Sequence, residues 1–239
     1  MISTPLQTSD ISIIIPTLNE EAQISRLSAC LLANSPQTDN NESPGEIIII
    51  DGGSSDLTVS LARHYGFRVV SCNPGRGTQL NHGARLASGR ILLFLHADTQ
   101  LPAGFTTAIL ASLEKAPTVA GAFRLKIKEA GLLLRLICFC ANLRSRLLQL
   151  PYGDQALFIR RDDFLRLGGF PETPIMEDFI FIKKAGRLGR ITTLPQYVTT
   201  SARRWQRLGV IRTTLINQLV ILGFYARVPL QKLTALYRR

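Results

Sequence analysis

The sequence lacks the features that mark membrane-spanning, secreted and disulfide-rich proteins. None of its apolar stretches reaches the roughly 18 uncharged residues that a spanning helix needs. The first ten residues, MISTPLQTSD, lack the basic and apolar regions of a signal peptide. The cysteines show no CxxC spacing and lie in apolar or mixed segments, at Cys30, Cys72, Cys138 and Cys140. We therefore expect a reduced, cytoplasmic protein with neither a disulfide framework nor a zinc site.

Acidic residues are missing from the last quarter of the chain. Residues 1–178 contain 16 Lys and Arg against 17 Asp and Glu, whereas residues 179–239 contain 12 Lys and Arg and no acid. The net charge of +11 therefore comes from this last quarter, which is either a solvated basic tail or a surface that meets anions. It includes LINQLVILGFYARVPLQKL, which is apolar at helical spacing and favours a basic amphipathic element at the anionic inner face of the cell membrane. No nucleic-acid motif is present, so we expect no nucleic-acid partner.

The N-terminal half alternates between apolar runs and helical patterns. We expect strands at residues 11–16, 47–50, 68–71 and 90–99 and helices at 20–33 and 54–66, with a third helix after the glycine-rich NPGRG. The segment SPQTDNNESPG, residues 35–45, is expected to be an exposed loop. This alternation predicts the α/β class, with a mostly parallel Rossmann-like sheet and helices on both faces.

The alternation loosens after residue 115. The segment VAGAFRLKIK (119–128), a long apolar and basic helix at 131–150 and the segment QALFIRR (155–161) predict an α+β half. We therefore expect one domain over residues 11–205, made of a nucleotide-binding half (11–115) and an acceptor half (116–205). A basic, amphipathic helical extension should follow at 206–239.

Polar segments follow the expected strands of the first half. They read PTLNEE, DGGSSD, CNPGRG and HADT. Because ligands bind beyond the carboxyl ends of parallel strands, we expect these four segments to converge on one crevice. The first strand is not followed by G-x-G-x-x-G, and a Walker loop is absent, so the crevice must hold a nucleotide by another scheme.

Five motifs in this order carry a resemblance to a known family. SIIIPTLNEE, IIIIDGGSSD, LLFLHADT, MED and RRW resemble the inverting family-2 glycosyltransferases with the A-type nucleotide-sugar fold, from about residue 11 to about residue 205. GDQ, GGFPE, IMED and SARRW are similar to a compact bacterial subgroup, some members of which are associated with carotenoid-type lipids or arsenosugars. The resemblance implies transfer of one sugar from a nucleotide-diphosphate sugar, with UDP favoured. The acceptor would be a hydroxyl or carboxyl of a small or lipid-like molecule, such as a carotenoid-type lipid.

The resemblance implies a donor site built from ten residues. They are Pro16, Thr17, Asn19, Glu20, Asp51, Gly52, Arg76, Ala97, Asp98 and Arg204. Asp51 would hold the uracil ring; alternatively, it forms a turn before Gly-Gly and caps local amides. Glu20 would contact the nucleotide, or it is a first-turn acid favoured by the helix dipole. Arg76 would lie close to the nucleotide, or it is an ordinary loop cation.

Asp98 is the expected ligand of a divalent cation, Mn²⁺ or Mg²⁺. A cation bridged to a carboxylate is the usual way to hold a diphosphate, although Asp98 could instead be a structural residue at a strand end. The family pattern is D-x-D, and His96 stands here where the first acid would be. We expect His96 to contact ribose or to pack rather than to bind the metal.

Catalytic roles are expected for Glu177 and Asp178. Inverting transfer needs one base to take the proton of the acceptor hydroxyl as its oxygen attacks the anomeric carbon. The family assigns that base to the second residue of its E-D pair, which is Asp178, with Glu177 orienting or assisting it. The alternative is an acidic helix N-terminus with no further role.

The acceptor side is expected to include Asp154, Gln155 and Trp205. SARRW departs from the family's Q-x-x-R-W, because Ser201 replaces the Gln that characterises processive polymer makers, and this favours single-sugar transfer. Arg204 could bind the diphosphate through two hydrogen bonds, and Trp205 could stack on an acceptor or belong to the core. Asp154 and Gln155 could instead fix the start of a strand.

Two other functions stay open at the level of sequence. A sugar-phosphate nucleotidyltransferase would also use an α/β nucleotide crevice, but PTLNEE stands where its glycine- and lysine-rich signature is expected. A non-enzymatic peripheral membrane scaffold would use the basic C-terminal segment alone. Its lipid binding would not depend on Asp51, Asp98 or Asp178.

Overall fold

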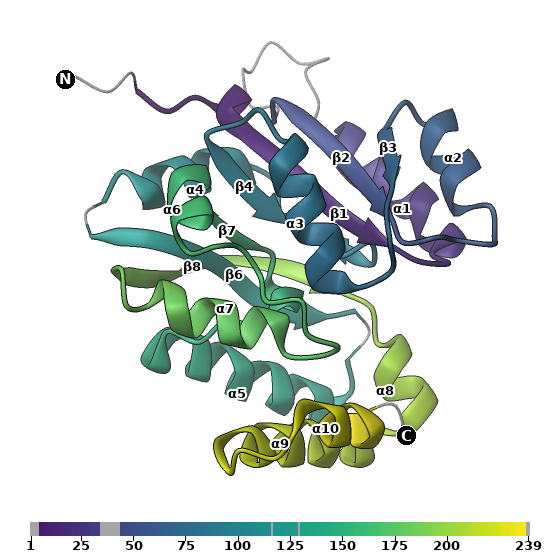
Figure 1. The fold of residues 1–239 in the computed structure, drawn as a ribbon, viewed down its shortest axis with the longest axis vertical. Coiled ribbons are helices and arrows are strands. Elements are labelled where there is room, and N and C mark those ends of the chain that lie inside the picture. The colour runs from purple at the N-terminus through teal and green to yellow at the C-terminus, as the bar shows by residue number, and fades with distance from the viewer. Residues whose placement is uncertain (1–4, 34–43, 116, 129, 238–239) are drawn as a thin grey trace.

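A single eight-stranded sheet forms the centre of the molecule (Figure 1). The computed structural model describes residues 5–33, 44–115, 117–128 and 130–237, so most of the expected loop at 35–45 lies outside the described residues. The strands follow the order β3-β2-β1-β4-β7-β6-β8-β5. The predicted fold class, α/β with a mostly parallel sheet and flanking helices, is confirmed.

The first half of the chain supplies four parallel strands. They are β1 (Ile11–Thr17), β2 (Glu46–Asp51), β3 (Arg68–Ser71) and β4 (Ile91–Phe94). β1 pairs with β2 and β4, and β2 pairs with β3. Because Thr17 is in register with Asp51, the polar segments that follow these two strands begin side by side.

Side chains of β1 and β2 alternate between two cores, one on each face of the sheet. Ile13 and Ile15 belong to the core that includes Ile24 of α1 (Glu21–Ala33) and Ala62 of α2 (Thr58–His64). Ile14, by contrast, belongs to the core that includes residues of α3 (Arg76–Leu86). Burial on both faces explains why these strands read as continuous apolar runs.

The second half continues the same sheet with mixed strand directions. Its strands are β6 (Thr118–Ile127), β7 (Leu157–Arg160) and β8 (Arg190–Thr200), and β5 (Thr99–Gln100), which belongs to the first half, pairs antiparallel with β8. β7 lies antiparallel between β4 and β6, and β8 runs parallel to β6. Further helices of the chain are α4 (Phe105–Leu113), α5 (Leu132–Leu148) and α7 (Glu177–Ala185). Shorter helical elements of the chain are η1 (Thr8–Asp10), η2 (Gly153–Gln155) and α6 (Arg161–Arg166). The 11-residue β8 was not predicted from the sequence.

The C-terminal segment is helical and packs on the domain. It forms α8 (Arg203–Leu208), α9 (Val210–Tyr225) and α10 (Leu230–Tyr237), with α9 beside α10 (Figure 1). Ile216, Val220 and Leu233 form a small core with Ile175, which precedes α7. Among the described residues, no helix combines the length and apolar character that crossing a membrane requires.

Candidate active site

A cavity of about 400 Å³ lies between the sheet, the start of α7 and the C-terminal helices. Charged and titratable side chains line it: Arg76, His96, Asp98, Asp154, Glu177, Asp178 and Arg204. Trp205 and the α9 and α10 side chains Val220, Ile221 and Tyr237 complete much of the wall. Seven of the expected site residues therefore share one cavity, although they come from positions 76 to 205 of the sequence.

Asp178 is held in a fixed orientation inside this cavity. Its Oδ1 accepts a hydrogen bond from the backbone N–H of Phe179 (2.7 Å), and its Oδ2 accepts one from Gly153 (2.6 Å). A Cβ at position 153 would lie 3.1 Å from Asp178 Oδ2 and 3.2 Å from His96 Nε2, so glycine permits this close approach. Each carboxylate oxygen keeps acceptor capacity for a further partner.

Glu177 lies deeper than Asp178 and pairs with Arg76. It is buried, and its Oε1 lies 3.4 Å from Arg76 Nη1. Burial raises the pKa of Glu177, the neighbouring charge of Asp178 raises it further, and Arg76 partly offsets both. α7 starts after Met176, whose φ of +65° is unusual for a residue with a side chain. This turn brings both acids to the cavity.

Asp98 is ionised and bound by neighbours from the end of β8. Its Oδ2 accepts hydrogen bonds from Ser201 Oγ (2.8 Å) and Arg203 Nη2 (3.3 Å). Burial alone would raise the pKa of Asp98, but His96, Ser201 and Arg203 together hold it below its usual value. Arg203 Nη2 also lies 2.8 Å from Glu20 Oε2. Arg203 thus joins the loop after β1 to the cavity.

His96 and Asp154 both carry strongly shifted pKa values. Burial, aided by the charge of Arg76, lowers the pKa of His96 to about 4 against the opposing effect of Asp98 and Asp178. The imidazole is therefore neutral at neutral pH. Burial raises the pKa of Asp154 to about 6, and among the described residues its Oδ1 has no hydrogen-bond partner.

The C-terminal helices contribute directly to the cavity. Arg204 donates a hydrogen bond from Nη1 to the hydroxyl of Tyr237, and its guanidinium carbon lies 3.7 Å from the centre of that ring. Burial, with the nearby charges of Arg76 and Arg207, lowers the pKa of Arg204 to about 10, so it stays cationic at neutral pH. Arg204 Nη2 and Trp205 Nε1 have no partner within the described part of the chain.

Asp51 does not line this cavity, and local groups occupy its carboxylate. Oδ1 accepts hydrogen bonds from Thr17 Oγ1 (3.2 Å) and Ser54 Oγ (2.5 Å). Oδ2 accepts bonds from the N–H groups of Gly53 and Ser54, both at 2.9 Å. These contacts fit the alternative of a turn-forming aspartate, and the role in holding a base stays a prediction.

The other expected donor residues lie around the same loops, outside the cavity wall. Asn19 accepts a hydrogen bond from Ser55 N–H (2.9 Å), so its side chain joins two loops. Pro16 and Thr17 lie beside Ile50 and Asp51 in the sheet, and Gly52 donates its N–H to Thr17 O (2.9 Å). Their roles stay predictions.

Two expected residues face the protein interior instead. Ala97 is buried in the hydrophobic core of β1 and α1. Gln155 is fully buried, accepts hydrogen bonds from Ser145 Oγ (2.6 Å) and Tyr152 N–H (3.2 Å), and donates to Phe123 O (2.9 Å). These contacts favour the alternative in which Gln155 fixes the start of β7.

The family model described as Glycosyl transferase family 2 matches residues 12–165. This match covers well over half of the chain. The chain belongs to glycosyl transferase family 2. The membership agrees with the resemblance carried by the sequence motifs.

Two curated relatives of the chain illustrate the range of this family. A PGL/p-HBAD biosynthesis glycosyltransferase of Mycobacterium tuberculosis is 38% identical over 108 residues, which cover 42% of this chain and 40% of that protein. A dodecaprenyl-phosphate galacturonate synthase of Rhizobium johnstonii is 27% identical over 150 residues, which cover 58% of this chain and 43% of that protein. The chain thus spans about two fifths of the length of these relatives.

Solved structures share the fold of this chain. A mannosyltransferase from Pyrobaculum calidifontis, in complex with GDP-Man and Mn²⁺, has a TM-score of 0.67 at 19% identity and covers 98% of this chain and 69% of its own. A glucosyl-3-phosphoglycerate synthase from Mycobacterium tuberculosis, in complex with Mn²⁺ and UDP-glucose, has a TM-score of 0.59 at 25% identity and covers 89% of this chain and 78% of its own.

The cavity fits a cation that takes some of its ligands from a bound diphosphate. Oxygen atoms are the ligands that Mg²⁺ and Mn²⁺ prefer, and the carboxylate of Asp98 in the cavity wall could supply them. Among the described residues, no three His, Cys, Asp or Glu side chains are grouped so that they could hold a metal ion alone. A diphosphate and water would have to complete the coordination shell, as is usual for Mg²⁺.

The sequence did not indicate three residues in and around this site. Arg203 is one residue before the matched R-W, and its position beside an expected site residue was the available signal. Gln79 is buried and donates from Nε2 to the carbonyls of Thr17 and Ile50, both at 2.8 Å, which ties the ends of β1 and β2 together. No sequence signal marks Gln79 or Tyr237.

Proposed function

We propose that this chain transfers one sugar, with inversion, from a nucleotide-diphosphate sugar to a hydroxyl or carboxyl of a lipid-like or small acceptor. The observation that carries the proposal is the shared cavity, in which four carboxylates face two guanidinium groups and a neutral imidazole. Such a cavity suits a reaction that needs both a base and compensation of a diphosphate's charge.

The donor would lie between the loops after β1 and β2 and the cavity, with UDP as the favoured nucleotide. Arg76 and Arg204 both line the cavity and would face the diphosphate. Asp51 would accept a hydrogen bond from the uracil ring of the nucleotide. This bond would replace the one that Asp51 now accepts from the Ser54 hydroxyl. UDP and GDP-Man in structures that share this fold support a nucleotide-sugar donor.

Asp178 would act as the base. It would take the proton from the acceptor oxygen as that oxygen bonds to the anomeric carbon and the bond from that carbon to the diphosphate breaks. A single displacement of this kind inverts the anomeric centre. Glu177 would hold Arg76 toward the leaving group through their 3.4 Å contact. A divalent cation held by Asp98 would neutralise the charge of the departing diphosphate.

The acceptor would enter beside the C-terminal helices. Ile175, Val220 and Ile221 make that part of the wall apolar, and Trp205 offers a ring with an unpartnered N–H. Asp154 would accept a hydrogen bond from the acceptor through its free Oδ1. A dodecaprenyl-phosphate galacturonate synthase among the relatives supports a lipid-like acceptor.

Thermal unfolding with a panel of UDP, GDP and their sugar conjugates, with and without Mn²⁺ or Mg²⁺, tests the proposal. A ligand at about 100 times its dissociation constant adds about 2.7 kcal/mol to the free energy of unfolding. We expect Asp98→Asn to remove the metal-dependent part of that gain and Asp162→Asn, on the surface of α6, to leave it intact. If no nucleotide or nucleotide-sugar stabilises the protein in any of these conditions, the proposal is wrong.

A further inference from the structure

Helix α5 packs on the domain by one face only. Its buried side chains, Leu134, Cys138 and Ser145, recur at the spacing of one helical stripe. On the same side Asn142 bonds both the N–H and the C=O of Leu125 in β6, at 2.7 and 3.0 Å. These contacts fix which way the helix faces.

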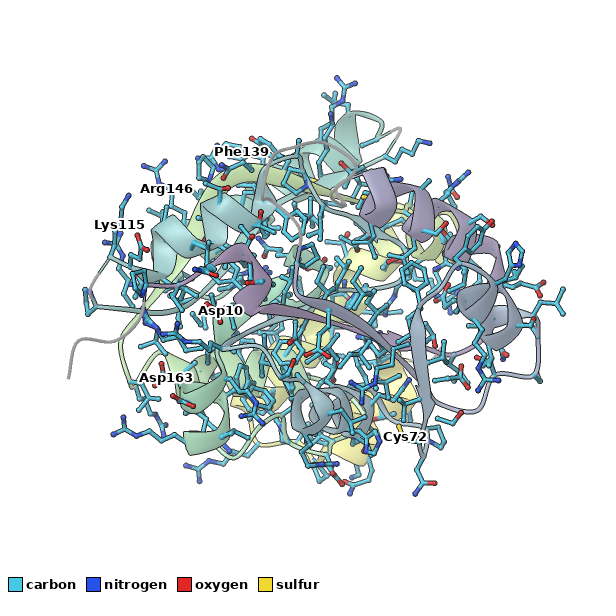
Figure 2. All side chains as sticks on the ribbon, turned by 90° about the horizontal axis from the view of Figure 1, so that it is seen from above. Asp10, Cys72, Lys115, Phe139, Arg146 and Asp163 are labelled. Atoms are coloured by element: carbon cyan, nitrogen blue, oxygen red, sulfur yellow. The ribbon has the colours of Figure 1, made fainter. Side chains whose placement is uncertain are left out.

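The opposite face of α5 exposes a continuous apolar stripe. Its members are Leu132, Leu136, Phe139, Leu143 and Leu147. The spacings of four, three, four and four residues place them on one side of the helix. Phe139 is 63% exposed, and Figure 2 places it with Arg146 at the same edge of the molecule. Isolated exposed leucines are ordinary, but a stripe along a 17-residue helix marks an interaction surface.

A basic groove of about 480 Å³ runs beside the stripe, between α5 and strands β6 and β8. Arg124, Lys126, Arg135 and Arg146 line it together with Phe139 and Leu143, and no described acidic residue does. Arg124 lies 5.7 Å from the centre of the Tyr197 ring, and Arg135 Nε donates to Ala130 O (3.0 Å). Within the described ranges, none of the four cations is ion-paired with a carboxylate.

The positive charge of this surface determines which kind of partner it can bind. A two-fold dimer presents the same patch from both copies, so a second copy of α5 would set these cations against each other. The partner must instead offer hydrocarbon to the stripe and negative charge to the groove. A bilayer with anionic headgroups offers both within the few ångströms that separate acyl chains from phosphates.

We propose that α5 and its basic groove dock this protein on an anionic lipid bilayer, with the Leu132–Leu147 stripe in the interface and the four cations on lipid phosphates. α5 would lie in the plane of the surface, and none of the docking residues lines the catalytic cavity. The proposal therefore goes beyond the sugar transfer and does not depend on it.

The same helix connects the docking surface to the acceptor side of the cavity. Arg144 lies 3.4 Å from the centre of the Tyr152 ring, and its Nε donates to Leu150 O (3.0 Å). Tyr152 is part of the cavity wall. A protein docked by α5 would thus hold its cavity beside the bilayer, where a lipid-like acceptor is found.

Sedimentation with lipid vesicles tests the docking of the full chain. We expect binding to phosphatidylcholine vesicles that contain phosphatidylglycerol and not to phosphatidylcholine alone. Raising the salt from about 0.1 M to about 1 M should release the protein, because the Debye length falls from about 10 Å to about 3 Å. Binding that is absent, or equal for both kinds of vesicle, would overturn the proposal.

Surface variants locate the docking site. Phe139→Ser and, as a second variant, Leu136→Ser should each lower the vesicle partition coefficient about tenfold. Arg146→Gln should lower it about fivefold on the anionic vesicles alone. Leu57→Ser, just before α2, and Arg63→Gln, in the last turn of α2, are matched exposed controls and should change nothing.

Two further results would overturn the assignment. One is a loss of vesicle binding for Leu222→Ser in α9 with no loss for Phe139→Ser, which would move docking to another helix. The other is a dimer in solution that Phe139→Ser dissociates, without vesicle binding by the parent protein. Nucleotide-induced thermal stabilisation, measured on the same variants, should be unchanged, and this separates failure of docking from failure of the proposed transfer.

Discussion

The two sides of the candidate active site differ in how their polar side chains are bonded. On the donor side, Asp51 accepts four hydrogen bonds at distances from 2.5 to 3.2 Å. On the acceptor side, Asp154 Oδ1 and Trp205 Nε1 have no partner among the described residues. The polar atoms compared are buried on both sides, so the two sides differ in hydrogen bonding and not in exposure.

This contrast separates residues that shape the site from residues that await a ligand. A buried polar group without a partner costs roughly 1–3 kcal/mol, and proteins keep such groups mainly where a ligand, water or ion bonds them. The Asp51 carboxylate already has its hydrogen-bond partners without a substrate. We expect Asp154 and Trp205 to gain their missing hydrogen bonds when a ligand occupies the cavity.

Replacing the proposed base should give the largest effect. Asp178→Asn keeps the size of the side chain but cannot accept a proton, so we expect turnover to fall by about 10²–10⁴-fold. Nucleotide-sugar affinity, measured by thermal shift, should be unchanged. Asp162→Asn, exposed on α6, is the control. Equal turnover in the two variants would rule out Asp178 as the base.

Replacing Asp51, whose carboxylate is fully hydrogen-bonded, should lower the free energy of unfolding more than replacing Asp154, whose Oδ1 has no partner. Asp51→Ala leaves the N–H groups of Gly53 and Ser54 without their acceptor, and we expect the free energy of unfolding to fall by about 1–3 kcal/mol. Asp154→Ala removes an unpartnered oxygen and should cost less. Urea unfolding of both variants measures the difference, and a larger loss for Asp154→Ala would reverse our comparison.

The donor half was largely predictable from sequence because its signals are local. The isoleucines of β1 and β2 are buried on both faces of the sheet, and a polar segment follows each strand. The order of residues alone therefore predicts the fold and the edge of the sheet at which the polar segments lie. Strand ends and family motifs also led us to expect that Asp51, Asp98 and Asp178 would share one cleft. Asp98 and Asp178 line the same cavity, whereas Asp51 does not line it.

The acceptor half depends on contacts that no local pattern encodes. β8 contains Pro195 and several polar residues, and it is a strand because it pairs with β6 over most of its length. Arg203 and Tyr237 reach the site through packing of α8 and α10. The bonding of Asp51 and the burial of Gln155 also required the tertiary structure.

The raised pKa of Asp154 predicts a pH-dependent stability. The carboxyl titrates at 3.8 in the reference state and at about 6 in the folded protein, so between these values the folded state binds more protons than the unfolded state. Stability from this group therefore falls as pH rises from about 4 to about 6. Asp154→Asn does not titrate and should be more stable than the parent protein near neutral pH, with the difference vanishing below about pH 4. A difference that stays constant across this window would contradict the assigned burial.

Arg203 should give the smallest effect on stability and the most informative one on metal binding. Its contacts with Glu20 and Asp98 are partly exposed, so Arg203→Gln should lower the free energy of unfolding by about 1 kcal/mol or less. The same change frees Asp98 from a competing cation, so Mn²⁺ should stabilise the variant at a lower concentration than it stabilises the parent. Arg68→Gln, which breaks a comparable contact with Glu46 on the sheet's other edge, should leave the Mn²⁺ dependence unchanged. If both variants shift the Mn²⁺ midpoint equally, Arg203 acts through overall charge and not by occupying the carboxylate that would hold the cation.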